Sequence, residues 1–90
     1  MEYKLLDEFG KIFNTKTKMD IIKTLISDPK KEWYGKEIAD FINVTPASVY
    51  IQILDLIKLG LVAEEKRGRM RFFKINKDNE IVKLFLNKTF

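Results

Sequence analysis

The sequence contains neither cysteine nor histidine. Without cysteine, the chain can form no disulfide bond and no thiolate metal site. Without histidine, it lacks the commonest metal ligand and the commonest general base near neutral pH. It also has no glycine-rich phosphate-binding loop, and Glu64 and Glu65 are neighbours on an expected strand, where they should point to opposite faces. We therefore expect no enzymatic activity, no metal and no cofactor.

Long hydrophobic runs are also missing. No apolar stretch approaches the roughly 18 residues that a membrane-spanning helix needs, and the acidic side chains within residues 1–13 do not fit a secretory signal. The chain has only 2 prolines and 4 glycines among 90 residues, and no linker rich in either. We expect a single domain over residues 1–90, located in the cytoplasm and without a membrane partner.

Positive charge is present but unevenly distributed. The chain has 17 Lys or Arg residues against 13 Asp or Glu residues, a net charge of +4. Residues 1–60 carry equal numbers of each sign, so the whole excess falls in residues 61–90. Within that part, one short segment without any acid holds Lys66, Arg67, Arg69, Arg71 and Lys74. A basic segment of this kind predicts a polyanionic partner.

The spacing of apolar residues predicts five helices. They are expected at about 3–13, from Thr17 to Asp28, at 35–42, at 46–59 and at about 79–88. Thr17, followed by Asp20, resembles a capping box and marks the expected start of the second helix. Around the fourth helix, at about 100° per residue, Val49, Ile53 and Leu56 share the face expected to enter the core.

Residues that typically begin or end helices, together with short apolar runs, predict the remaining elements. Asn43 suits the left-handed conformation that ends a helix, and Thr45 with Pro46 suits the start of the next one. Trp33 and Tyr34 predict a short strand, with Trp33 in the core, and residues 61–66 and 70–75 predict a hairpin that turns through Arg67-Gly68-Arg69. The expected fold is mainly α with a small β-hairpin (α+β), comprising about five helices and a two- to three-stranded antiparallel sheet.

Residues 36–59 thus form two expected helices joined by a short turn, as in a helix-turn-helix, and a basic hairpin follows at once. This arrangement resembles the winged-helix domains of ArsR/MarR-like transcriptional regulators, and in particular a small archaeal-type member. The resemblance runs from about Phe13 to Ile75. It rests on the segments Phe13-Asn14-Thr15-Lys16-Thr17-Lys18, Lys36-Glu37-Ile38-Ala39, Val44-Thr45-Pro46-Ala47-Ser48-Val49, Gly60-Leu61-Val62 and Arg69-Met70-Arg71-Phe72-Phe73.

The family resemblance implies a transcriptional regulator that binds double-stranded DNA. It implies that residues 46–59 form a recognition helix in the major groove and that residues 66–71 form a wing on the backbone or minor groove. It also implies a homodimer, for which the outer helices at 3–13 and 79–88 are the expected dimerisation elements. The alternative for these two helices is that they pack on the core of their own chain.

The candidate DNA-binding residues lie at the start of the third helix, in the first turns of the fourth, and in the wing. They are Lys36, Thr45, Ala47, Ser48, Tyr50, Ile51, Lys66, Arg67, Arg69 and Arg71. Hydroxyl groups can donate to phosphates or bases, small apolar side chains can contact a thymine methyl group, and arginine suits phosphate. Arg69 and Arg71 are expected on one face of the hairpin.

Each candidate also has a structural interpretation. Thr45 can serve as a helix cap alone, Tyr50 can flank the core, and Lys36 can be a solvated lysine. Charges on the hairpin can discourage pairing with other strand edges, and Phe72 can pack on a dimer partner or stay exposed.

The fourth helix departs from the usual pattern of a recognition helix. Its only base is Lys58, and Leu54 and Ile57 are apolar where polar residues are expected. This leaves a second function open, a winged-helix module that binds a protein partner through the face formed by Ile51, Leu54 and Ile57.

Overall fold

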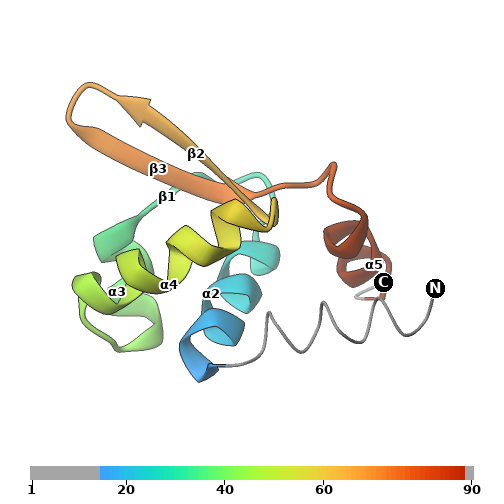
Figure 1. Cartoon of the computed structure of the whole chain (residues 1–90), viewed down its shortest axis with the longest axis horizontal. Helices are drawn as coiled ribbons and strands as arrows, with labels where there is room; N and C mark the ends of the chain where they lie inside the picture. The colour runs from blue at the N-terminus through green and yellow to red at the C-terminus, as the bar shows by residue number, and fades with distance from the viewer. Residues whose placement is uncertain (1–14, 89–90) are drawn as a thin grey trace.

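The computed structural model of the chain describes residues 15–88. In chain order these form α2 (Lys16–Ser27), β1 (Trp33–Tyr34), α3 (Gly35–Ile42), α4 (Pro46–Lys58), β2 (Val62–Arg67), β3 (Met70–Ile75) and α5 (Glu80–Lys88) (Figure 1). The helix predicted at 3–13 lies outside the described residues. The remaining predicted helices are all present, and none of the described helices is long and apolar enough to cross a membrane.

A small antiparallel sheet lies against a group of three helices. Its strand order is β1-β3-β2, and β3 pairs with both neighbours. Figure 1 shows α2, α3 and α4 gathered beside the sheet, with the β2–β3 hairpin extending beyond them and α5 at the opposite end of the molecule. The hairpin is therefore anchored at its base and projects at its tip.

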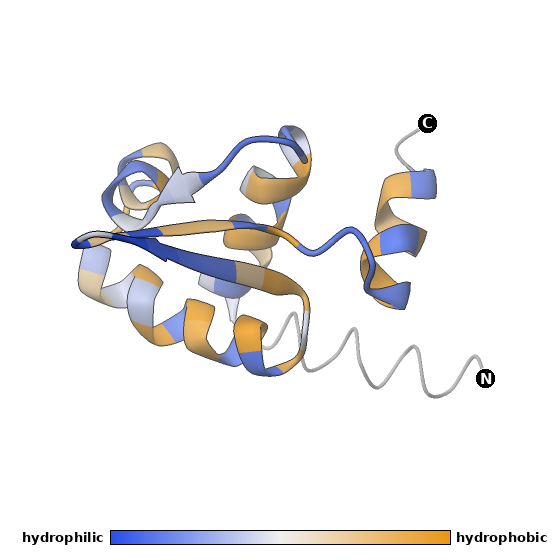
Figure 2. Cartoon of the chain, turned by 90° about the horizontal axis from the view of Figure 1, so that it is seen from above, coloured by the Kyte–Doolittle hydropathy of each residue, from blue (hydrophilic) through white to orange (hydrophobic). Residues whose placement is uncertain are grey.

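The core lies between these helices and the base of the sheet, where the apolar faces meet (Figure 2). Val49, Ile53 and Leu56 of α4 are fully buried, which confirms the predicted inner face of this helix. Trp33 of β1 is also buried, as predicted, and pairs in register with the fully buried Phe73 of β3. Burial of this face determines how α4 is rotated and therefore which of its residues point outward.

The start of α2 differs from the prediction by two residues. Thr15, not Thr17, is the N-cap, and its hydroxyl accepts a hydrogen bond of 3.1 Å from the backbone N–H of Lys18. Thr15 has the extended backbone conformation that an N-cap requires, whereas Thr17 already lies inside the first turn. Asp20, the expected partner of Thr17, instead forms an ion pair with Lys16 at 2.7 Å.

In the turn between α3 and α4, the residues that end one helix and begin the next are those predicted from the sequence. Asn43 has a left-handed backbone with φ of 63°, and it ends α3. The hydroxyl of Thr45 accepts a hydrogen bond of 3.2 Å from the backbone N–H of Ser48, and Pro46 is the first residue of α4. The helix ends at Lys58, one residue before the predicted end, and Gly60 follows with φ of 77°.

The hairpin is tighter than predicted. The first strand covers 62–67 instead of 61–66, because Arg67 pairs with Met70 and leaves a turn of only Gly68 and Arg69. Gly68 has φ of 62°, as expected for the first central residue of a two-residue turn of type II′. Arg69 therefore belongs to the turn, so strand alternation does not place it on the face of Arg71 as predicted.

A second junction connects the base of the hairpin to α5. The side-chain amide of Asn76 donates a hydrogen bond of 2.8 Å to the backbone carbonyl of Gly60. Asn79 then caps α5, since its side-chain oxygen accepts from the backbone N–H groups of Ile81 and Val82. Val82 is fully buried, so α5 contributes to the core from its N-terminal turn.

Candidate nucleic-acid interface

The outward face of α4 is largely apolar. Ala47, Ile51, Leu54 and Lys58 form one stripe along the helix, opposite its buried face. The side chains of Ile51 and Leu54 are 65% and 47% exposed. Because Thr45 and Pro46 begin the helix at the short turn from α3, Ala47 and Ile51 occupy its first two turns, the part of a helix-turn-helix that approaches base edges.

The other candidates near this end of the molecule differ in their surroundings. Lys36 is exposed in the first turn of α3, and Thr45 is exposed but its hydroxyl caps α4. Tyr50 is half-buried, with its ring 6.2 Å from that of Phe73. Its ring also fills the space beside Gly35, where an added Cβ would lie 2.5 Å from the Tyr50 hydroxyl. Tyr50 therefore packs α4 against α3 and the sheet.

The acidic residue on α4 is paired with a buried lysine. Lys18 of α2 is only 5% exposed, and its ammonium group lies 2.8 Å from a carboxylate oxygen of Asp55. The hydrogen bond from Lys18, together with its positive charge, lowers the pKa of the Asp55 carboxyl below its usual value. The buried ammonium group of Lys18 thus balances the negative charge of Asp55, and this ion pair also links α2 to α4.

The wing arginines have separate partners. The guanidinium of Arg67 lies 3.1 Å from a carboxylate oxygen of Glu32 and 3.2 Å from one of Glu65. It also stacks on Phe72, with 4.0 Å between the guanidinium carbon and the ring centroid. Phe72 in turn makes an edge contact with Tyr34 at 6.5 Å, so this aromatic side chain packs within its own chain.

Arg71 lies on the opposite face of the hairpin, toward α4. It forms an ion pair with Glu64, and this hydrogen bond raises the pKa of the Arg71 guanidinium above its usual value. Its guanidinium carbon is 5.5 Å from the ring centroids of both Tyr50 and Phe73. Glu64 and Glu65 point to opposite faces of β2, as predicted, and each of them holds one arginine.

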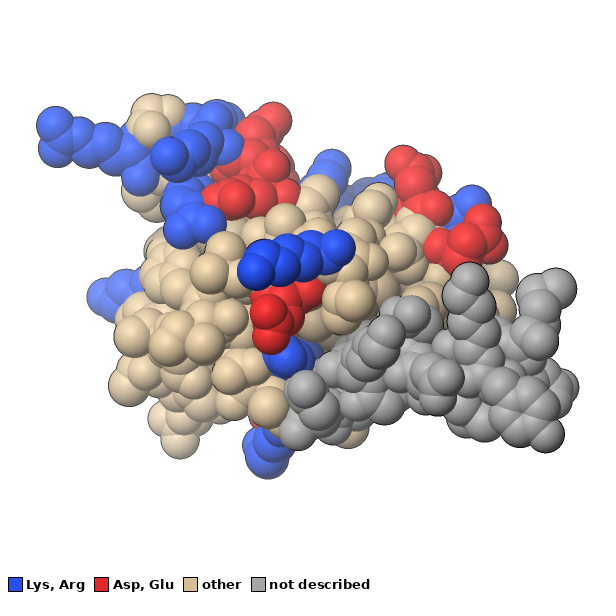
Figure 3. Space-filling view, viewed as in Figure 1, with Lys and Arg blue, Asp and Glu red and all other residues tan. Residues whose placement is uncertain are grey.

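Two cations remain at the projecting end of the hairpin. Lys66 and Arg69 are exposed, and neither forms an ion pair with any residue in 15–88. Figure 3 shows the basic side chains of the hairpin projecting from the body of the molecule, with acidic side chains gathered toward its base. The basic segment seen in the sequence therefore divides into Arg67 and Arg71, which are held by glutamates, and Lys66, Arg69 and Lys74, which form no ion pair with a residue in 15–88.

The acidic partners were not among the candidates from the sequence. Glu64 and Glu65 are close in sequence to the arginines, but their pairing depends on the register of β2 against β3. Glu32 precedes β1 and reaches Arg67 only because β1 adds to the sheet beside β3. A charge pattern along a strand could have suggested the first two pairs, whereas no local signal indicates the third.

The predicted protein-binding face of α4 is smaller than expected. Ile57 is half-buried and packs against the core, so it does not join Ile51 and Leu54 on the outer face. That part of the prediction was wrong, because Ile57 lies closer to the inner face of the helix than the apolar pattern suggested.

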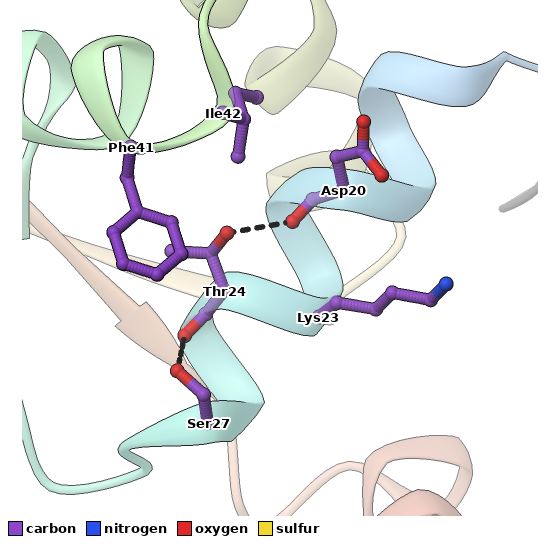
Figure 4. Close-up of a pocket in the computed structure, with 6 residues that line it drawn as sticks. All are labelled: Asp20, Lys23, Thr24, Ser27, Phe41 and Ile42. Atoms are coloured by element: carbon purple, nitrogen blue, oxygen red, sulfur yellow. Dashed lines mark hydrogen bonds between the residues drawn. The ribbon is translucent and has the colours of Figure 1, made fainter.

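A shallow cleft lies between α2 and α3, away from the wing (Figure 4). It is lined by Asp20, Lys23, Thr24, Ser27, Phe41 and Ile42. The hydroxyls of Thr24 and Ser27 donate to the backbone carbonyls of Asp20 and Thr24, so they are already used within α2. Within residues 15–88, no group of acidic side chains is arranged to hold a metal ion.

Comparisons with known proteins give structural but not sequence matches. No protein-family model and no curated protein sequence matches the chain. Reduced HlyU from Vibrio cholerae has a similar structure, with a TM-score of 0.76 at 15% identity over 97% of this chain and 86% of that one. NolR from Sinorhizobium fredii gives a TM-score of 0.73 at 14% identity over 98% of this chain and 83% of that one.

A third similar structure is described as a homodimeric winged helix-turn-helix DNA-binding domain. It is the 1–100 fragment of Mb0332 from Mycobacterium bovis, a possible ArsR-family transcriptional regulator, with a TM-score of 0.74 at 17% identity over 97% of this chain and 77% of that one. The present chain has a winged helix-turn-helix fold. In this winged helix-turn-helix, α3 and α4 are the helix-turn-helix and the β2–β3 hairpin is the wing. The predicted fold is confirmed, whereas the expectation of an archaeal-type protein gains no support.

Proposed function

We propose that this protein binds double-stranded DNA and acts as a transcriptional regulator. The observation that carries the proposal is that a projecting wing with the exposed residues Lys66 and Arg69 lies at the same end of the molecule as the exposed first turns of α4. Figure 1 shows the tip of the wing and the start of α4 at the same end of the molecule. A helix in the major groove and a wing on the adjacent backbone would use these two features together.

The ion pairs suggest which wing residues contact DNA and which hold the wing in position. Lys66 and Arg69 are proposed to contact phosphates directly, since cations without a carboxylate partner lose no ion pair on binding. Arg67 and Arg71 are proposed to set the position of the wing, the first through Glu32 and Glu65 and the second through Glu64 and Tyr50. All four wing candidates from the sequence remain in the proposed interface, but in two roles.

We also propose that the protein acts as a homodimer. Mb0332, which has the same fold, is described as homodimeric. In α5, Leu84 lies about 200° around the helix from the buried Val82, at about 100° per residue, and it is only partly buried, so part of an apolar side chain is left for a partner. A dimer would carry two wings, and two half-sites on DNA would match its twofold symmetry.

Fluorescence anisotropy with a labelled random duplex tests the DNA-binding proposal. A dimer with two tip cations on each wing makes about four phosphate contacts, which predicts a roughly 100-fold loss of affinity between 50 and 200 mM salt. The double variant Lys66→Gln, Arg69→Gln should bind much more weakly at 50 mM salt and should lose most of this salt dependence.

The matched control is the double variant Lys23→Gln, Lys30→Gln. It removes the same charge from exposed positions on and just after α2, away from the wing. Binding close to that of the unmodified protein is expected for this control. If the unmodified protein fails to bind at 50 mM salt, or if the two double variants lose affinity equally, the proposed interface is wrong.

A further inference from the structure

We infer that α4 reads the 5-methyl groups of thymine in the major groove, so that the preferred DNA is rich in A·T pairs. This inference rests on the proposed function and names the kind of DNA that the site would select. The side chains that carry it are Ala47 and Ile51 in the first two turns of α4, with Leu54 beside them.

The outer stripe of α4 offers almost no hydrogen-bonding readout. Arginine, lysine, asparagine and glutamine make the bidentate contacts that identify guanine or adenine, and the one such residue on this stripe is Lys58, in the last turn of α4 and away from its first two turns. The one glutamine of α4, Gln52, is half-buried and its side-chain oxygen accepts a hydrogen bond of 3.4 Å from the Thr15 hydroxyl. Asp55 is paired with Lys18, as described above.

Apolar contact is what the stripe does offer. Ile51 is 65% exposed, and Ala47 is exposed one helical turn before it. The methyl group of thymine is the apolar feature of the major-groove edge, whereas the other three bases present only hydrogen-bond donors or acceptors there. An apolar side chain placed against those polar groups would remove them from water without replacing their hydrogen bonds, which is unfavourable. Thymine methyl groups are thus the part of the major groove that complements the apolar stripe of α4.

The spacing along the helix suits neighbouring base pairs. Ala47 and Ile51 are four residues apart, which is about 6 Å along the helix axis. Successive base pairs are about 3.4 Å apart, so the two side chains can meet methyl groups about two steps apart. Ser48, half-buried beside this stripe, can add a hydrogen bond but no bidentate pattern.

Charge decides between DNA and a protein as the occupant of this face. The tip of the β2–β3 hairpin, which carries the exposed residues Lys66 and Arg69, lies at the same end of the molecule as the start of α4 (Figure 1). These two residues give a phosphate backbone two contacts that an apolar protein surface would leave unused. The apolar stripe beside a cationic wing therefore fits a groove that has methyl groups inside and phosphates on its rim.

Duplexes that differ only in the 5-methyl group test the inference. An alternating A·T duplex is compared with the same duplex containing deoxyuridine in place of thymidine, and a G·C duplex with its 5-methylcytosine form. At 50 mM salt the methylated member of each pair should bind more tightly, by about four-fold for each methyl group contacted. The salt dependence should be equal within each pair, because the phosphate contacts are unchanged.

Two variants assign the effect to α4. Ile51→Ser should reduce the preference for thymine over uracil, by about four-fold if this side chain contacts one methyl group. Phe41→Ser is the matched control, since Phe41 is also 65% exposed but lines the cleft between α2 and α3 (Figure 4). This control should keep the full preference.

The outcomes separate the inference from the function on which it rests. If thymine and uracil duplexes bind equally well, the methyl reading is wrong although the DNA-binding proposal stands. If no duplex binds at 50 mM salt, both fail. If Ile51→Ser keeps the preference but changes the molecular mass measured by sedimentation equilibrium, the inference is overturned and the face of Ile51 joins two copies of the chain.

Discussion

Arginine at three nearby positions serves different purposes in this wing. Arg67 stacks on Phe72 and pairs with Glu32 and Glu65, whereas Arg71 pairs with Glu64 beneath the hairpin. Exposed ion pairs contribute little to stability on average, so their main effect here is to orient the hairpin. Arg69, in the turn, has no carboxylate partner within residues 15–88 and keeps its full charge for a ligand.

The pairing of Lys18 with Asp55 makes stability depend on pH. The pKa of Asp55 is lowered in the folded chain, so the pair stabilises the fold above the unfolded pKa of about 4 and this contribution disappears as the pH falls through the folded value. We predict that Asp55→Asn lowers the melting temperature at pH 7 and that its difference from the unmodified protein shrinks below pH 4. Thermal denaturation followed by circular dichroism from pH 7 to pH 2.5 measures both effects.

Asp40→Asn is the control for this experiment. Asp40 is an exposed carboxylate on α3 that forms no ion pair with another described residue. This variant should melt close to the unmodified protein at pH 7. A constant difference for Asp55→Asn across the whole pH range would contradict the role assigned to the ion pair.

Among the elements, the β2–β3 hairpin depends most on a single local conformation. Its two-residue turn requires a positive φ at Gly68, and a Cβ added there would meet no atom within 4 Å. The cost of replacing this glycine therefore arises in the backbone and not from a clash. The same turn holds Arg69 at the tip, so stability and ligand contact depend on one short segment.

We predict that Gly68→Ala lowers the free energy of unfolding by about 1–3 kcal/mol, the cost of a positive φ in a residue that carries a side chain. Gly68→Asn should cost less, because asparagine is found more often than alanine at the positive-φ positions of such hairpin turns. Urea denaturation at pH 7 compares the two variants. An equal loss for both would show that the backbone conformation of the turn is not the cause.

The molecule as a whole presents two regions with different expected partners. The wing and the start of α4 lie at one end, and α5 lies at the other (Figure 1). This separation lets a contact between two copies through α5 leave the proposed DNA-binding face open. A protein stabilised by association should also melt at a higher temperature when its concentration is raised.

We predict that Leu84→Glu shifts the protein from dimer to monomer, because it places a charge on the apolar face of α5 that points away from Val82. Sedimentation equilibrium measures the mass, and thermal denaturation at several concentrations gives an independent readout. Lys83→Glu places a carboxylate at an exposed position of α5 about 100° around the helix from Leu84 and should leave the dimer intact. A monomeric unmodified protein, or dimers in both variants, would argue against this interface.

Most of the architecture could be predicted from local patterns. The inner face of α4, the left-handed Asn43 and the turn at Gly68 each depend on residues that are close in the chain. Helical periodicity, capping and positive φ act over a few residues, so these features need no knowledge of the remaining fold. The start of α2 was missed because Thr15 and Thr17 are both plausible caps, and backbone geometry selects between them.

The roles within the candidate site required the folded chain. Sequence patterns gathered Lys66, Arg67, Arg69, Arg71 and Lys74 into one basic segment, but strand register and the position of β1 determine which of them meet glutamates. The pairing of Lys18 with Asp55 likewise depends on how α2 and α4 pack together, and Ile57 is half-buried because it packs against the core. Local signals act through neighbours in the chain, whereas the partners of a charged side chain are residues that the fold brings together from distant positions.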